Sequence, residues 1–166
     1  TAMGTPPAPP YATIFYALHE NEMLPRWTQQ IPFYKRFIDD VLGVWLSHPD
    51  PAQDKLLWDE FCMDMDQWHG LKWECETPSR AVNFMDLTIT MVDGHLETTL
   101  FEKAMNLYLY LPPHSSHPNG VFTGLIFGQV LRIRRLCTHK RDATKKIRQF
   151  FQRLLARGHT QEALGP

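Results

Sequence analysis

The sequence predicts an α+β fold, in which short strands are paired by hairpin turns and helices pack against them. Three observations predict it: apolar and polar residues alternate in several short stretches, apolar residues recur three and four apart in others, and turn-forming residues separate them. With 166 residues, 43% of them hydrophobic, the chain is large enough for one domain, or for one domain plus a small appendage.

Two helices are predicted in the first half of the chain. The first follows a proline-rich stretch and runs to about Glu22, with Pro10 in its first turn, where no N–H partner is needed. Its apolar stripe consists of Tyr11, Ile14, Phe15 and Leu18. The second is expected over residues 50–69, with Pro51 in its first turn and Gly70 ending it. Its apolar face consists of Leu57, Phe61, Met65 and Trp68.

Strands are predicted between and after these helices. Two of them, Tyr34–Ile38 and Val41–Leu46, are joined across Asp39-Asp40, because two adjacent aspartates suit a hairpin turn. Alternation also predicts strands over Leu71–Glu76 and Val82–Val92. The residues Val92-Asp93-Gly94-His95 are typical of a hairpin that returns through Leu96–Phe101.

The last part of the chain is predicted to be helical. A loop rich in proline, histidine and serine, Pro112–Gly120, leads into a helix over Val121–Cys137. A final helix runs over Asp142–Arg157, and Gly158 ends it. The apolar stripe of this last helix consists of Ile147, Phe150, Phe151, Leu154 and Leu155.

Charge is distributed unevenly along the chain. The net charge of −1 combines a balance of −9 over residues 1–100 with a balance of +8 over residues 101–166. Between Leu131 and Arg157 there are ten basic side chains and one acid, Asp142. An acidic body with a basic end indicates an anionic partner, most commonly nucleic acid, although such runs also form plain solvated helix faces.

The composition excludes some classes of protein. Three widely spaced cysteines argue against a disulfide framework and against a cysteine zinc site, and they fit a reducing compartment. No apolar run approaches the roughly 18 residues that a membrane span needs. His114 and His117 are three residues apart, but they have no cysteine partner. This favours a loop that is structural or contacts a nucleic-acid strand over a zinc site.

Asp39 and Asp40 are the candidate metal ligands. Two carboxylates at a hairpin tip between apolar strands are costly to bury without a cation, and hard oxygen ligands suit Mg²⁺. A solvated turn is the alternative, since aspartate is a favoured turn residue.

Several segments carry a family resemblance. Phe37-Ile38-Asp39-Asp40 resembles the aromatic-x-Asp-Asp box of reverse transcriptases, and residues 2–15, which contain Gly4, resemble the glycine-containing segment of that family. Further segments follow in the family order: Phe84–Ile89, Leu100–Lys103, Tyr110–Pro118, Arg132–Cys137 and Phe151–Gly158. Together they resemble the reverse transcriptases of Penelope-like retroelements, whose cores are similar to telomerase reverse transcriptase.

The resemblance implies roles for individual residues. Asp39 would be the principal metal ligand with Asp40 beside it, and Gly4 would let the backbone approach the incoming nucleotide. Phe37, or its neighbour Ile38, would pack near the primer terminus. Further implied roles are proton donation to pyrophosphate by Lys103 and primer-backbone contact by Tyr110–Pro113. Their unbalanced charge predicts nucleic-acid binding by Arg132, Arg135, Arg141, Lys145 and Arg148. Ala104-Met105 follow Lys103 where the family has Pro-Thr.

The implied organisation is a polymerase palm fragment over residues 1–111, with an antiparallel sheet centred on the Asp39-Asp40 hairpin. A connecting loop and a helical thumb would occupy residues 112–166. The implied activity is an RNA-directed DNA polymerase that extends a DNA primer on an RNA template with dNTPs, using two Mg²⁺ ions, or Mn²⁺ in their place.

This activity needs a further aspartate and the finger residues, which we expect before Thr1, so the chain alone is expected to be inactive. We also expect an intracellular protein, nuclear rather than cytoplasmic. Self-association through an exposed sheet edge is expected too. A non-catalytic retroelement remnant, or a co-opted nucleic-acid-binding module, is the alternative function.

Overall fold

The computed structural model describes residues 4–118 and 120–164, and the fold is α+β. The chain divides into two compact units, Thr1–Ser79 and Arg80–Pro166, which we call unit 1 and unit 2. No helix among the described residues is long and apolar enough to cross a membrane. The predicted division at residues 111/112 concerns function, and it stays a prediction.

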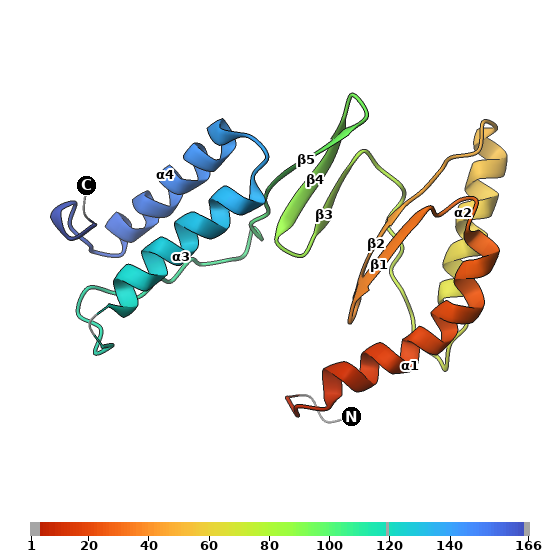
Figure 1. The fold of residues 1–166 in the computed structure, drawn as a ribbon, viewed down its shortest axis with the longest axis horizontal. Coiled ribbons are helices and arrows are strands. Elements are labelled where there is room, and N and C mark those ends of the chain that lie inside the picture. Colours follow the sequence, from red (N-terminus) through yellow and green to blue (C-terminus); the bar gives the residue numbers. More distant parts are fainter. Residues whose placement is uncertain (1–3, 119, 165–166) are drawn as a thin grey trace. The chain divides into compact units, whose positions relative to one another are not determined.

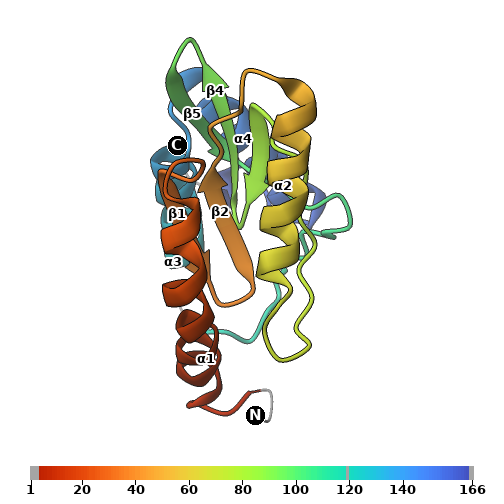
Figure 2. The ribbon, with the colours of Figure 1, turned by 90° about the vertical axis from the view of Figure 1, so that its right-hand side faces the viewer.

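Unit 1 consists of two helices on one face of a β-hairpin (Figures 1 and 2). Its elements are α1 (Ala8–Met23), a 3₁₀ helix (Leu24–Trp27), β1 (Phe33–Phe37), β2 (Asp40–Val44) and α2 (Pro51–Met65). Asp50 caps α2, because its carboxylate accepts a hydrogen bond from the backbone N–H of Ala52 at 3.0 Å. The antiparallel register pairs Phe33 with Val44 and Phe37 with Asp40.

The core of unit 1 is aromatic and lies between its helices. Its buried apolar residues are Tyr16, Met23, Trp27, Phe61 and Met65. Asp64 is buried beside them, and its carboxylate accepts a hydrogen bond from the Trp27 indole N–H at 2.8 Å and pairs with Arg26 at 3.2 Å. These partners replace the water that a buried carboxylate would otherwise need.

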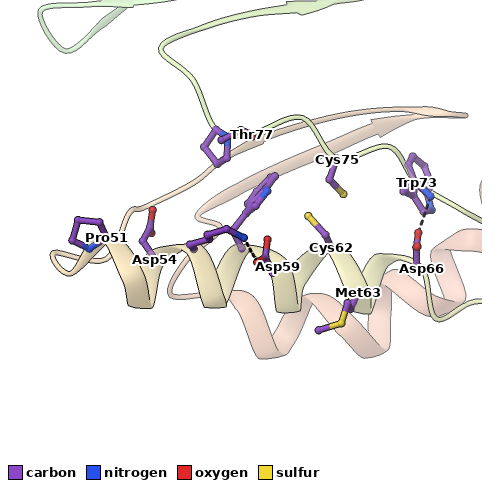
Figure 3. A pocket seen from close by; sticks show the side chains of 12 residues that line it. Pro51, Asp54, Asp59, Cys62, Met63, Asp66, Trp73, Cys75 and Thr77 are labelled. Carbon is purple, nitrogen blue, oxygen red and sulfur yellow. Dashed lines mark hydrogen bonds and ion pairs between the residues drawn. The ribbon is translucent and has the colours of Figure 1, made fainter.

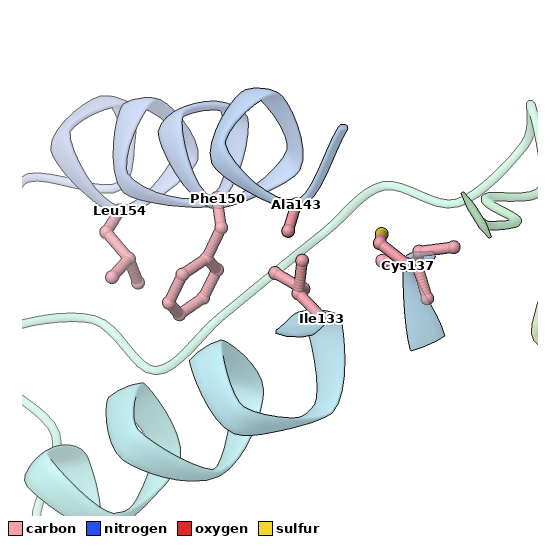
Figure 4. Packing of buried hydrophobic residues seen from close by; sticks show 6 residues of the cluster. Ile133, Cys137, Ala143, Phe150 and Leu154 are labelled. Carbon is pink, nitrogen blue, oxygen red and sulfur yellow. The ribbon is translucent and has the colours of Figure 1, made fainter. Parts of the chain in front are cut away.

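Unit 2 combines a three-stranded antiparallel sheet with two helices. Its elements are β3 (Ala81–Phe84), β4 (Leu87–Val92), β5 (His95–Leu100), α3 (Val121–Leu136), α4 (Lys140–Ala156) and a 3₁₀ helix (Glu162–Leu164), and the strand order is β3-β4-β5. Figure 4 shows the core between the helices, where Ile133 and Cys137 meet Ala143, Phe150 and Leu154.

The turn between α3 and α4 is fixed to β5. The Thr138 hydroxyl accepts a hydrogen bond from the Thr98 N–H at 2.8 Å, and the Thr138 N–H donates to the Thr98 carbonyl at 2.9 Å. His139 lies 2.8 Å from the Glu97 carboxylate. Through these contacts and Leu100, β5 joins the sheet to the helical pair.

Many predicted elements are confirmed. The hairpin across Asp93-Gly94 forms as expected, with φ of +48° and +78°, the left-handed values that an Asp-Gly turn supplies. The helices α3 and α4 agree with the predicted ranges to within two residues at each end. Phe150 and Leu154 of the predicted stripe are buried, whereas Leu155 is exposed.

Other predicted elements are wrong. Residues 71–76 form no strand, and α2 ends at Met65 instead of His69. The strand predicted over Val82–Val92 is two strands with a turn at Met85-Asp86. The antiparallel sheet predicted around the Asp39-Asp40 hairpin contains, among the described residues, only β1 and β2, and β3–β5 form a separate sheet.

The edges of the β1–β2 hairpin favour association with another chain. The described residues place no third strand beside β1 or β2, and unpaired edge groups favour pairing with another chain. We expect the protein to self-associate with rising concentration in sedimentation experiments. Phe33→Lys, which places a charge on the exposed side of β1, should shift the equilibrium toward monomer. A compact monomer at all concentrations would contradict an exposed edge.

Candidate metal centre and nucleic-acid interface

The predicted metal ligands lie at the β1–β2 turn. Ile38 and Asp39 are the two turn residues, and Asp40 is the first residue of β2, paired with Phe37. Both aspartates are exposed. Ile38 has φ of +56°, which is uncommon for any residue with a side chain and costs a β-branched residue on the order of 1–3 kcal/mol. The turn is therefore strained at the residue that precedes the carboxylate pair.

Arg36 anchors this turn to α1. Its guanidinium donates to both carboxylate oxygens of Glu20, at 2.6 and 2.8 Å, in a bidentate pair. It also donates to the carbonyl of Ile38 at 3.0 Å and to the carbonyl of Thr13 at 2.9 Å. The Arg36 side chain is only 4% exposed. One buried side chain thus joins β1, the strained turn and α1.

Two tyrosines complete the anchor. The Tyr34 hydroxyl donates to Glu20 at 2.8 Å, and the Arg36 guanidinium lies 5.1 Å from the centre of the Tyr16 ring. The hydrogen bond from Arg36 to Glu20 raises the pKa of Arg36, while burial and Glu20 raise the pKa of Tyr34. At neutral pH the arginine is therefore charged and the tyrosine neutral, which is the state that these hydrogen bonds require.

The register of the hairpin places Asp40 on the face opposite the helices. Directly paired residues share a face, and Tyr34 and Arg36 face α1, so Phe37 and Asp40 face away from it. Lys35 and Leu42 form the next pair on this open face. Asp40 and its pairing partner Phe37 therefore both lie at the turn end of this open face.

Within the part of the chain that the structure describes, the two aspartates have no third side chain beside them to complete a metal site. Across residues 4–118 and 120–164, no three side chains of the His, Cys, Asp and Glu types are close enough to hold an ion. Gly4 has φ of +84°, so its conformation favours glycine, but a Cβ there would meet nothing within 4 Å. The described residues show no contact between Gly4 and either aspartate.

Three predicted residues of unit 2 line one pocket. Lys103, Tyr110 and Arg132 surround a cavity of about 410 Å³, together with Asp86 at the β3–β4 turn. Arg132 forms an ion pair with Asp86, and Lys103 is exposed. The Tyr110 ring packs edge-on against Phe150, 5.0 Å away, so it is part of the core of unit 2.

A row of basic side chains lies on the exposed face of α4. Arg141, Lys145 and Arg148 are exposed at helical spacing, and Arg135 is exposed near the end of α3. Arg141 is 3.7 Å from the Asp142 carboxylate, while the described residues contain no acidic partner for the other three. Of the residues predicted to bind nucleic acid, Arg135, Lys145 and Arg148 are thus exposed and not paired with an acid among the described residues.

Other basic residues of α4 have a structural role. Glu102 accepts hydrogen bonds from Lys146, at 2.7 Å, and from Arg153, and Arg153 also stacks 3.5 Å from the centre of the Tyr108 ring. Burial raises the pKa of Glu102, but Arg153 and Lys146 outweigh burial, and the pKa lies below its usual value. Arg157 donates to the Tyr110 carbonyl at 3.0 Å. These side chains hold residues 102–111 against α4.

Unit 1 has a larger cavity of about 640 Å³ along α2 (Figure 3). Its lining does not include Asp39 or Asp40. The sulfur atoms of Cys62 and Cys75 face each other across it. Burial raises the pKa of both thiols, so both are protonated at neutral pH.

Sequence reasoning missed Arg36 and Glu20 as the residues that hold the candidate site. One signal was available: Tyr34, Arg36 and Ile38 alternate along the predicted strand and therefore share a face. A charged residue between two apolar residues on a packed face requires a buried partner. Nothing in the sequence marks Glu20 as that partner.

Comparison with known proteins gives one finding, and it lies in unit 2. Residues 109–163, about a third of the chain, match the family described as animal helix-turn-helix domain. The match covers α3, the turn and α4. No curated protein and no solved structure shows a significant match to the sequence.

The anchor of the turn generates a stability prediction. Glu20→Gln keeps the shape of the side chain but leaves the buried Arg36 charge without a counter-charge, so we expect a loss of about 3 kcal/mol in the free energy of unfolding. Lys55→Met breaks an ion pair with Asp59 whose side chains are 75% and 50% exposed, and it should cost less than about 1 kcal/mol. Urea denaturation measures both, and equal losses would contradict a special role for the anchor.

Proposed function

We propose that this chain is part of an RNA-directed DNA polymerase, in which unit 1 contributes carboxylates to the catalytic metal site and unit 2 binds the nucleic-acid backbone. The observation that supports this best is the strained turn at Ile38, which presents Asp39 and Asp40 and is held by buried Arg36. A turn that only reversed the chain would need no such strain, because glycine or asparagine adopts this φ more readily. Strain retained in this way is typical of functional sites.

Asp39 and Asp40 are suited to supply part of the coordination of a magnesium ion. Mg²⁺ is usually bound by one or two protein carboxylates, with waters and substrate phosphates completing its coordination. Asp39 and Asp40 fit that role, and the catalytic centre would need another carboxylate from outside the described residues. Bound metal ions would stabilise charge on the attacking and leaving oxygens. The contribution of this chain is to hold Asp39 and Asp40 together, with Phe37 beside them for the primer terminus.

The helices of unit 2 suit a contact with nucleic-acid phosphates. Arg135, Lys145 and Arg148 have no acidic partner among the described residues, so binding phosphates would release counterions without breaking ion pairs. The name of the matching family, a helix-turn-helix domain, agrees with a nucleic-acid partner.

The packing of α3 and α4 favours backbone contact over base reading. Phe122, near the start of α3, stacks on His159, just beyond the end of α4, with ring centres 4.1 Å apart. The helices are therefore antiparallel along their length, as Figure 1 shows. A helix-turn-helix that reads the major groove has helices at about 90–120°. An antiparallel pair instead presents the side of α4, and phosphate contacts carry no sequence information.

A non-catalytic nucleic-acid-binding module is the second candidate. It is favoured by the family match, which covers residues 109–163 and does not include the hairpin of unit 1. Both candidates predict nucleic-acid binding by unit 2. They differ in whether Asp39 and Asp40 bind a divalent metal.

Titration with Mn²⁺ distinguishes these candidates. In the polymerase, the ion should bind at the turn, so paramagnetic broadening in NMR spectra should be strongest for residues 38–41. Asp39→Asn with Asp40→Asn should abolish it. The matched control is Asp59→Asn with Glu60→Gln, which removes two adjacent exposed carboxylates from α2 and should leave the broadening in place. Broadening spread evenly over the acidic residues would contradict a metal site at the turn.

Nucleic-acid binding by unit 2 is tested by its salt dependence. Changing Arg135, Lys145 and Arg148 to alanine should weaken binding to an RNA–DNA duplex. The slope of log affinity against log salt concentration should become less steep by about 2 to 3, because each lost phosphate contact removes roughly 0.9 from it. Changing Lys35, Lys55 and Lys72 of unit 1 to alanine removes the same charge and should have a smaller effect. If the two triple variants bind alike, only net charge matters and the interface is placed wrongly.

A further inference from the structure

The pocket beside the β3–β4 turn lies in unit 2, and its residue Arg132 is on α3, the helix that also carries Arg135. It is lined by the turn, by the segment that follows β5 and by α3, and its volume is about 410 Å³. Leu100 and Tyr110 contribute apolar surface, and Asn106 and Gln129 contribute amides. A cavity of this size and mixed lining is suited to one small polar group on an apolar base.

The charges around this pocket differ in whether they are available. Glu102 also lines it, but its carboxylate is already shared between Lys146 and Arg153. Lys103 is exposed and has no ion pair among the described residues. The remaining charges, Asp86 and Arg132, are paired with each other.

The pair of Asp86 and Arg132 is open to solvent. Their side chains are 61% and 41% exposed, and ion pairs as exposed as this one contribute little stability. A phosphate could therefore displace Asp86 from Arg132 at little cost. The guanidinium would gain a bidentate partner of the same charge, and Lys103 would add a second cation beside it.

The β3–β4 turn repeats the geometry of the β1–β2 turn. Met85, like Ile38, is the first turn residue and has positive φ, +53°, and Asp86 occupies the same turn position as Asp39. The Asp86 carbonyl accepts a hydrogen bond from the Phe101 N–H at 2.8 Å, which fixes the backbone of the turn. Asp86 can therefore release Arg132 while the turn keeps its place.

We infer that Arg132 and Lys103 form a subsite for one phosphodiester group of a nucleic-acid strand, and that Asp86 competes with this phosphate for Arg132. The inference rests on the proposed binding of nucleic acid by unit 2, and it adds the position of one phosphate and the group that opposes it. Asp86 acts here as a counter-ion that weakens binding.

The test compares two aspartates on neighbouring turns of one sheet. Asp86→Asn frees Arg132, so affinity for an RNA–DNA duplex in fluorescence anisotropy should rise by a factor of about 1.4 to 5, which corresponds to an exposed ion pair. Asp93→Asn removes the same charge from the β4–β5 turn, where the described residues show no ion pair, and should raise affinity less. Equal gains from both variants would overturn the inference, because net charge alone would then explain them.

A second substitution identifies Arg132 as the group that is released. In the Asp86→Asn protein, Arg132→Gln should remove the gain and lower the salt slope by about 0.9, the value for one phosphate. A gain that persists without Arg132 would overturn the inference while leaving the proposed function intact. If the unaltered protein does not bind the duplex at all, the proposed function of unit 2 fails together with the inference.

Discussion

The buried contact between Arg36 and Glu20 is the constraint on which the candidate metal centre depends. A hairpin of five paired residues on each strand has little cohesion of its own, since an isolated pair of strands is marginally stable in water. Arg36 ties this hairpin to α1 at Glu20 and Thr13, and the same guanidinium reaches the carbonyl of Ile38. The contact that stabilises unit 1 therefore also sets the conformation of the turn that presents Asp39.

Two turns of the same geometry have different electrostatic surroundings. Asp39 has no basic partner within the described residues, whereas Asp86 is paired with Arg132. An unpaired carboxylate beside a second one is suited to a cation, and a carboxylate held by arginine is suited to release that arginine to an anion. Turns with the same backbone geometry can thus be suited to a cation or to an anion. Which of the two applies depends on whether a neighbouring helix supplies a basic side chain.

Local chemistry explains which parts of the fold could be predicted from the sequence. Asp93-Gly94 determines its own turn, and the helix-breaking residues around α3 and α4 limit those helices. Tertiary contacts explain the failures. The carboxylate of Asp66 accepts the Trp73 N–H at 2.7 Å, just after α2 ends, so the following chain packs on the helix instead of forming a strand. The turn at Met85 has no glycine to reveal it. For the candidate site, the sequence indicated the aspartates but not Glu20, which is sixteen residues from Arg36.

The basic residues near the end of the chain have two different roles, although in the sequence they form one run of positive charge. Glu102 neutralises Lys146 and Arg153, and the carbonyl of Tyr110 holds Arg157, so these cations fasten residues 102–111 to α4. Other cations of the same helix, Lys145 and Arg148 among them, are exposed on its opposite side. A charge count cannot separate the two sets, because the separation depends on which side of α4 each residue occupies. In the proposed function, the exposed set of α4 is available to exchange counterions for phosphates, together with Arg135 of α3.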